Sequence, residues 1–349
     1  MALSNISTYA LNSSLRSITI DRQQKINVAS QEVATGRLAD IGYSLGGNTH
    51  YSLAIENEIK MLDQTKVTNS FVTSRLESMQ LSLSNLVTFS NDLVGQLAAE
   101  VTGTLDRDLL ESFGRNAFES ASSALNLNVR GEYVFSGVNS DTIALVDYEG
   151  TSGAPAKTAV QNAFSTHFGF APSDPAAANL TPSDIEGFVD GPFATLFDDA
   201  NWQTLWSGAS DRGVRSKISL RELVETPTTA QAQSFRNIVA SSVLMLEFAN
   251  GNFSGDAVNQ LSESGLNLAA SGVSGLALEQ GKIGVVEERV SNASDSMDFQ
   301  SEVLNNQQID LTGVDPYEAA TRLQSLAIGL EASYAATARI QNLSIMNYI

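Results

Sequence analysis

The sequence contains no cysteine and only two histidines among its 349 residues. Without thiols the chain cannot form disulfides, hold a metal through thiolates or use a cysteine nucleophile. The histidines, His50 and His167, are far apart in sequence and fall in different predicted regions, and no catalytic or metal-binding motif accompanies them. We therefore predict no metal, no cofactor, no catalytic residue and a protein that is not an enzyme.

Basic residues are also scarce. The 20 Lys and Arg residues stand against 39 Asp and Glu, which gives a net charge of −19. Nucleic-acid binding depends on clustered Lys and Arg, so this balance argues against a nucleic-acid partner. No apolar run approaches the roughly 18 residues of a membrane span. The first residues, MALSN, lack the basic and apolar regions of a secretory signal. We expect an acidic protein with neither membrane insertion nor an ordinary signal peptide.

Helical periodicity dominates what is present. One long proline-free pattern, residues 52–101, would form a rod roughly 75 Å long at about 1.5 Å per residue. A single compact globule cannot surround such a rod, so we predict a mainly α fold, an elongated helical bundle or coiled-coil rod built from the N- and C-terminal halves. Apolar residues recur at spacings of three and four over residues 3–34, 52–101, 105–129, 229–249 and 256–311, and from Pro316 to the end.

The middle of the chain breaks this periodicity. Five of the seven prolines and both tryptophans fall between residues 141 and 226. We predict a small inserted domain there, mixed α/β or β-rich, with a strand near 216–225 and a short helix within 193–206. A further strand is predicted just before it, near 132–137. Trp202 and Trp206 are interpreted as domain core or, alternatively, as the stacking platform of a ligand-binding module. The predicted divisions are terminal helices (1–35 and 315–349), a helical rod (36–140 and 228–314) and a variable outer domain (141–227).

Apolar stripes at both ends of the chain are the most informative feature. Chain ends are usually polar and frayed, so amphipathic helices there need a partner. We interpret the stripes as a coiled-coil assembly interface. The alternative is that they only form an intramolecular core. The predicted interface residues are Leu3, Ile6, Leu11, Leu15, Ile18, Leu323, Leu326, Leu330, Tyr334, Ile345 and Tyr348.

Four segments carry a resemblance to the flagellin superfamily, and within it to the hook-associated proteins of the hook–filament junction. The resemblance covers about residues 1–140 and 230–349. The segments are 131–137 (GEYVFSG), 315–323 (DPYEAATRL), 330–339 (LEASYAATAR) and 343–349 (LSIMNYI).

The resemblance implies that the terminal helices pair as an inner coiled coil, fold on assembly, and carry an outward-projecting middle domain. It also implies a secreted protein, exported through the flagellar type III channel and placed at the hook–filament junction. The implied partners are further copies in a ring, the neighbouring hook-associated protein, flagellin and an export chaperone. The alternatives are flagellin itself, the filament subunit, and a ligand-binding module in the middle domain. The ending Asn347-Tyr348-Ile349 favours the junction protein over flagellin.

Overall fold

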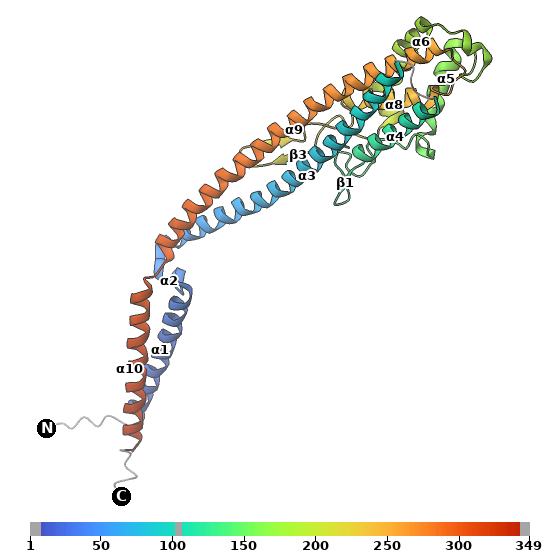
Figure 1. Cartoon of the computed structure of the whole chain (residues 1–349). Helices are drawn as coiled ribbons and strands as arrows, with labels where there is room; N and C mark the ends of the chain where they lie inside the picture. Colours follow the sequence, from blue (N-terminus) through green and yellow to red (C-terminus); the bar gives the residue numbers. More distant parts are fainter. Residues whose placement is uncertain (1–7, 102–106, 343–349) are drawn as a thin grey trace, which may run out of the picture. The chain divides into compact units, whose positions relative to one another are not determined.

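The computed structural model describes residues 8–101 and 107–342, and most of them are helical (Figure 1). Two helices are very long, α3 (Thr49–Val101) and α9 (Gly255–Thr312). They are about 80 and 87 Å long at 1.5 Å per residue. The chain divides into two compact units, residues 1–64 with 296–349, and residues 65–295. The predicted mainly α fold, built on long helices from both halves of the sequence, is confirmed.

The first unit contains the helices nearest the chain ends, α1 (Thr8–Thr35) and α10 (Pro316–Asn342), which lie side by side (Figure 1). Residues 36–50, between the predicted helices, hold two short helices, α2 (Ile41–Leu45) and η1 (Gly46–Asn48). The carboxylate of Asp40 accepts the backbone N–H of Tyr43 at 2.8 Å and so caps α2.

The connections at the ends of α1 and α9 are tied together by backbone hydrogen bonds. Leu38 N–H donates to the Thr312 carbonyl at 2.8 Å, and Val314 N–H donates to the Gly36 carbonyl at 3.1 Å. Gly36 adopts a φ of +66°, which suits glycine after a helix C-terminus. These bonds fix where α1 stops and where α10 starts.

The second unit is built around α8 (Gln233–Phe248), which is buried along almost its whole length. Helix α4 (Arg107–Leu125) packs against it, and α3 and α9 add buried side chains such as Met79 and Ile283. Helices α4 and α8 approach closely at Gly114, where an added Cβ would lie 2.6 Å from the Leu246 nitrogen. The core therefore joins residues from both halves of the sequence.

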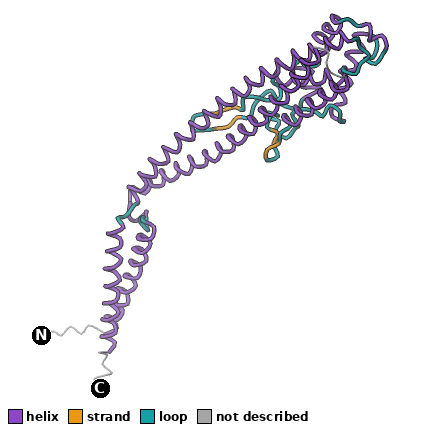
Figure 2. The backbone as a smooth tube through the Cα atoms, viewed as in Figure 1, coloured by secondary structure: helices purple, strands orange, loops and turns teal. Residues whose placement is uncertain are grey.

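The strands form two small antiparallel hairpins (Figure 2). In the first, β1 (Asn128–Val129) pairs with β2 (Glu132–Tyr133), and Arg130 and Gly131 turn with positive φ. In the second, β3 (Arg215–Lys217) pairs with β4 (Leu223–Glu225). The predicted strands at 132–137 and 216–225 are therefore shorter than expected, and the second one is a hairpin because the chain reverses after Ile218.

The other regular elements of residues 141–227 are short helices joined by loops, so the mixed α/β description of this segment fits better than the β-rich one. The predicted helix at 193–206 is present in pieces. The short elements are η2 (Thr151–Gly153), α5 (Ala154–Phe168), η3 (Pro175–Asn179), α6 (Pro182–Phe188), η4 (Val189–Phe193), α7 (Asp199–Asn201) and η5 (Trp202–Trp206).

Aromatic rings hold these short helices together. Trp202 and Trp206 are fully buried and stacked, with ring centroids 6.0 Å apart, and Tyr148 stacks on Trp206 at 5.5 Å. The indole N–H of Trp202 donates to the Ala230 carbonyl at 3.0 Å, so its polar atom is also satisfied inside the core. The tryptophans are core residues and leave no exposed face for stacking a ligand.

Candidate assembly interface

Helices α1 and α10 form an antiparallel pair whose polar contacts run along its length. Gln23 Nε2 donates to the Tyr334 hydroxyl at 2.7 Å. Further toward the end of α1, Arg322 Nη1 lies 3.1 Å from Glu32 Oε2. Higher residue numbers in α1 meet lower residue numbers in α10, so the two helices run in opposite directions.

The seam includes small and polar residues as well as Leu326. Ala29 on α1 is buried, as are Ala319 and Ser333 on α10. At Gly329 the missing side chain leaves space for the guanidinium of Arg22, which lies against the helix there. Small residues let the two backbones approach closely at these positions.

The large apolar residues of α10 flank the seam. At about 100° per residue, Leu323, Leu330 and Tyr334 lie to one side of the positions that face α1. Leu323 and Leu330 are half-buried, and Tyr334 is 49% exposed. The pair of helices thus presents an apolar flank that it cannot cover by itself.

Six of the predicted interface residues have described side chains. Leu15 and Leu326 are half-buried, like Leu323 and Leu330, and Ile18 is 42% exposed, in the same state as Tyr334. Leu11 belongs to α1, but its side chain is outside the described part of the structure. The remaining four lie outside the described residues altogether: Leu3, Ile6, Ile345 and Tyr348.

Sequence reasoning missed the polar members of the seam. The contacts of Glu32 with Arg322 and of Gln23 with Tyr334 join residues about 300 positions apart. The available signal was a charged residue on each of the two amphipathic helices, Glu32 on α1 and Arg322 on α10. It was not used, because surface charges on helices are common and carry no partner information on their own. Further exposed apolar residues off the predicted stripes, Ile20, Val28 and Ile328, were also missed.

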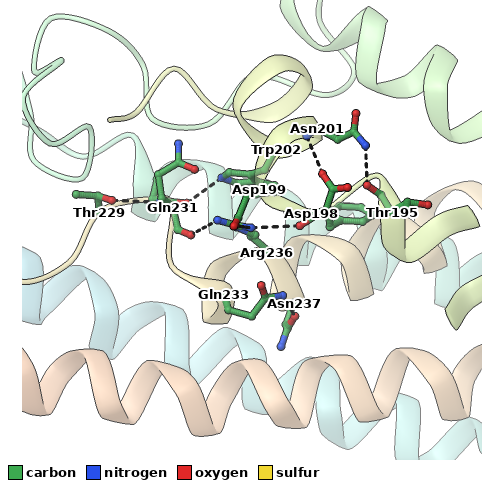
Figure 3. Close-up of polar contacts among 12 residues, drawn as sticks. Thr195, Asp198, Asp199, Asn201, Trp202, Thr229, Gln231, Gln233, Arg236 and Asn237 are labelled. Carbon is green, nitrogen blue, oxygen red and sulfur yellow. Dashed lines mark hydrogen bonds and ion pairs between the residues drawn. The ribbon is translucent and has the colours of Figure 1, made fainter. Parts of the chain in front are cut away.

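A second polar cluster lies in the middle of the chain, around Arg236 on α8 (Figure 3). The buried guanidinium donates to the Gln231 carbonyl at 2.6 Å and pairs with the Asp199 carboxylate. Asp198 accepts the Asn201 N–H at 2.8 Å and caps α7. The acidic pair Asp198 and Asp199 therefore holds short helices in place, and this cluster is structural.

Several other charged groups form ion pairs nearer the surface. The pKa of Arg115 is raised by hydrogen bonds to Glu149 and Glu111, and the pKa of Glu56 is lowered by its hydrogen bond from Lys60. His50 and His167 are both exposed. Among the described residues no group of three or more histidine or acidic side chains could hold a metal ion. No helix within those residues is long and apolar enough to cross a membrane.

Comparison with known protein families finds two matching regions in the chain. Its residues 6–140 match the bacterial flagellin N-terminal helical region, and residues 266–349 match the bacterial flagellin C-terminal helical region. The two matches together cover well over half of the sequence. The chain belongs to the flagellin family and is a structural component of the bacterial flagellum, a role that is not catalytic in this family.

One solved structure with a similar fold is described as a flagellar hook-associated protein from Vibrio parahaemolyticus. It is 11% identical in sequence, with a TM-score of 0.53, and the alignment covers 77% of this chain and 99% of that one. At this identity the likeness concerns the fold alone. Comparison with curated proteins gives no match.

Proposed function

We propose that this chain is a hook–filament junction protein of the hook-associated protein 3 type. It assembles into a ring through its terminal helices, residues 1–35 and 315–349, which form the inner coiled coil. Residues 36–140 and 228–314 form the helical rod, and residues 141–227 project outward. Its further partners are flagellin, the neighbouring hook-associated protein and an export chaperone.

The uncovered apolar flank of α1 and α10 is the observation that carries this proposal. Ile18 and Tyr334 are both more than two-fifths exposed, although they lie on helices whose partner in the same chain is already in place, and Ile328, on another side of α10, is also exposed. Leaving apolar surface in water costs about 25 cal/mol per Å², so covering it by other copies drives association.

The choice between junction and filament rests on sequence. Segment 131–137 and the ending Asn347-Tyr348-Ile349 resemble hook-associated proteins more than flagellins. The fold likeness to the Vibrio protein is compatible with this choice and adds nothing about location. Flagellin, the filament subunit, is the competing assignment, because the length, the acidity and the terminal helices suit both.

Immunogold electron microscopy of isolated flagella, with antibody raised against residues 141–226, separates the two. We expect gold particles confined to one narrow band between hook and filament. Labelling along the whole filament would make the chain a flagellin. Antibody preabsorbed with the recombinant chain provides the control for unspecific labelling.

The ligand-binding alternative receives no support from residues 141–227. Its proposed platform, Trp202 and Trp206, is fully buried. A titration of tryptophan fluorescence with saccharides or nucleotides is expected to leave the emission unchanged, and a saturable change would revive this alternative.

A further inference from the structure

A polar cavity of about 570 Å³ lies in the second unit, where α9 meets the loop that precedes α8. The loop contributes residues 226–229 and 231–233, and α9 contributes Glu279 and Lys282. Three carboxylates and one ammonium group line the cavity, so two negative charges are in excess. Among the described residues that line it, no apolar side chain is larger than proline. The cavity therefore suits a polar or cationic ligand.

The packing of α9 against α8 explains how distant residues meet in this cavity. Gly272 of α9 lies against Ile238 of α8, and Gly275 lies against Ser234, where an added Cβ would come within 2.5 and 2.8 Å of those side chains. Rising residue numbers in α9 thus meet falling residue numbers in α8. One turn beyond Gly275, the same pairing places Glu279 beside the loop that precedes α8.

Three residues that line the cavity each carry a buried oxygen without a hydrogen-bond partner in the part of the chain that the structure describes. The atoms are Oγ1 of Thr228, Oε1 of Gln231 and Oε2 of Glu279. The three residues are 3%, 9% and 7% exposed, respectively. A buried polar atom without a partner reduces stability, so a group that satisfies all three from within the cavity would bind favourably.

The contacts of the neighbouring atoms make these oxygens acceptors. Nε2 of Gln231 donates to the Ala209 carbonyl at 2.7 Å, which fixes the orientation of the amide and leaves Oε1 to accept. Nζ of Lys282 donates to Oε1 of Glu279 at 2.8 Å, so one oxygen of this carboxylate is paired and the other is not. The cavity therefore has a surplus of acceptors, which a cation satisfies better than an anion does.

The other two carboxylates add charge at the edge of the cavity. Glu225 is exposed, accepts the Gly213 N–H at 3.1 Å and lies 3.5 Å from Arg215, so it is already engaged. Asp211 is also exposed. Acidic side chains alone form no metal centre among the described residues. A cation in this cavity would therefore depend on the buried amide and hydroxyl oxygens as well.

We propose that this cavity is a calcium site, with Glu279, Gln231 and Thr228 as its protein ligands and water completing the shell. Calcium accepts about six to eight oxygen ligands in a flexible geometry, and it uses carboxylates, side-chain amide carbonyls and water together. Magnesium requires a more regular octahedral shell. Neither histidine nor cysteine is among the described lining residues, so the site does not suit zinc or copper.

The bound ion would join α9 to the loop that precedes α8, and so hold together segments from distant parts of the sequence. We expect a Kd of about 10⁻⁴ to 10⁻³ M, as for the weak calcium sites of extracellular modules. Gln231 and Glu279 are separated by about 50 residues and belong to no calcium-loop motif, so a site of this kind leaves no signal in the sequence. The inference is independent of the choice between junction protein and filament subunit.

Titration calorimetry of the full-length chain, stripped of metal with a chelator, tests the proposal. Calcium chloride is added in about 0.1 M potassium chloride, which screens diffuse attraction to the acidic surface. We expect one saturable site per chain and a thermal unfolding temperature that rises with calcium concentration. Magnesium should bind at least about tenfold more weakly. The absence of saturable binding would mean that the cavity holds only water, and equal affinity for magnesium would mean diffuse attraction. Either result would overturn the proposal.

Glu279→Gln is the first variant. It keeps the shape of the side chain and removes the charge of the buried ligand, so we expect the calcium affinity to fall by about tenfold or more. Glu288→Gln is the matched control, because Glu288 is exposed on the same helix and outside the cavity. The control should bind calcium like the natural chain. Unchanged affinity in Glu279→Gln would place the ion elsewhere and overturn the site.

Thr228→Val is a second variant that changes no charge. It removes one buried oxygen and keeps the side-chain shape, and we expect calcium to bind about threefold more weakly or worse. Thr158→Val, at an exposed position of α5, is its control. Circular dichroism in chelator establishes that each variant is folded before the titration. Natural affinity in Thr228→Val would remove this hydroxyl from the ligand set and contradict the proposed site.

Discussion

Arg322 on α10 pairs with Glu32 on α1, with Nη1 and Oε2 3.1 Å apart, although the two residues are 290 positions apart in the sequence. The Glu32 side chain is only 5% exposed, and its other oxygen accepts the Ala39 N–H at 3.4 Å. Arg322 is half-exposed and also reaches Glu318 at 3.2 Å. One carboxylate thus links α1, the connection that follows it and α10.

Replacement of Arg322 by Ala should loosen the pairing of the two chain ends. The loss leaves the buried Glu32 carboxylate without its cation, and we expect a cost of about 1 kcal/mol after allowance for the exposure of Arg322. Limited proteolysis of the monomer is the measurement. In the natural chain we predict that the protease removes about 30 residues from each end first. In the variant we expect the same cleavage to be faster. Cutting within residues 65–295 before the ends would contradict this order.

Leu326→Asp and Leu330→Asp should block assembly and leave the second unit folded. Each places a charge at or beside the α1–α10 seam, where assembled copies would have to bury it. Sedimentation reports assembly, and thermal unfolding followed by circular dichroism reports the fold. Ser325→Asp, on an exposed position of the same helix, is the control and should assemble normally. Normal filaments or rings from either leucine variant would defeat the proposed interface.

Gly114→Ala should destabilise the second unit. Its new Cβ would lie 2.6 Å from the Leu246 nitrogen and 2.7 Å from the Ser242 oxygen, and backbone atoms cannot move aside cheaply. Overpacking of this kind costs about 1–3 kcal/mol. Urea unfolding measures the change. Gly281→Ala, on an open helical position, should be neutral or stabilising by up to about 1 kcal/mol. A Gly114→Ala variant as stable as the natural chain would mean that α4 and α8 are less tightly packed than described.

Asn69 is buried on α3 and donates to the Ile218 carbonyl and to Ser294 Oγ, both at 3.0 Å. Its replacement by Ala removes both bonds and leaves the carbonyl of Ile218 without this donor, so we expect a loss of about 1–3 kcal/mol in the free energy of unfolding. Gln300, another amide on an apolar pattern, is exposed and bonds only to Ser296. Gln300→Ala should change stability by less than about 0.5 kcal/mol. Equal losses in the free energy of unfolding of the two variants would contradict this prediction.

Stability should fall in alkaline solution because of Tyr148. Burial raises the pKa of its hydroxyl above the ordinary value of 10.0, with a smaller contribution from the charge of Glu247. Above pH 10 the unfolded chain loses this proton while the folded chain keeps it, so the free energy of unfolding decreases as pH rises. The slope from one such group is at most about 1.4 kcal/mol per pH unit. Urea unfolding at pH 9, 10 and 11 measures it, and Tyr148→Phe should flatten the dependence. If the free energy of unfolding of Tyr148→Phe falls with pH as steeply as that of the natural chain, the dependence comes from other groups.

The long helices could be predicted from sequence because their periodicity extends over many turns. Helix α9 is continuous through Gly272, Gly275, Gly281 and Gly284, since the first two contact Ile238 and Ser234 of α8, where a side chain would clash. The short helices of residues 141–227 could not be predicted as such. They carry too few turns for a periodic signal, and their positions depend on the aromatic core between them.

The candidate interface was predicted only in its apolar part. Leu323, Leu326 and Leu330 follow the pattern of a buried stripe, and the structure places them at the seam or beside it. The seam residues Gln23, Glu32 and Arg322 depend on which turn of α1 meets which turn of α10. That register comes from the hydrogen bonds joining Gly36 to Val314 and Leu38 to Thr312, which no local pattern contains.

The core of the second unit has a consequence for the order in which the chain becomes folded. Helix α4 is complete by residue 125, yet its buried face meets α8, which begins at Gln233. More than a hundred residues separate the end of α4 from the start of α8. If the chain leaves a narrow channel N-terminus first, α4 therefore cannot pack until those residues have also emerged. Folding of the second unit depends on contacts between residues far apart in the sequence and is expected to be slow. The polypeptide therefore stays unfolded, and able to pass through a narrow channel, until more than two-thirds of it has emerged.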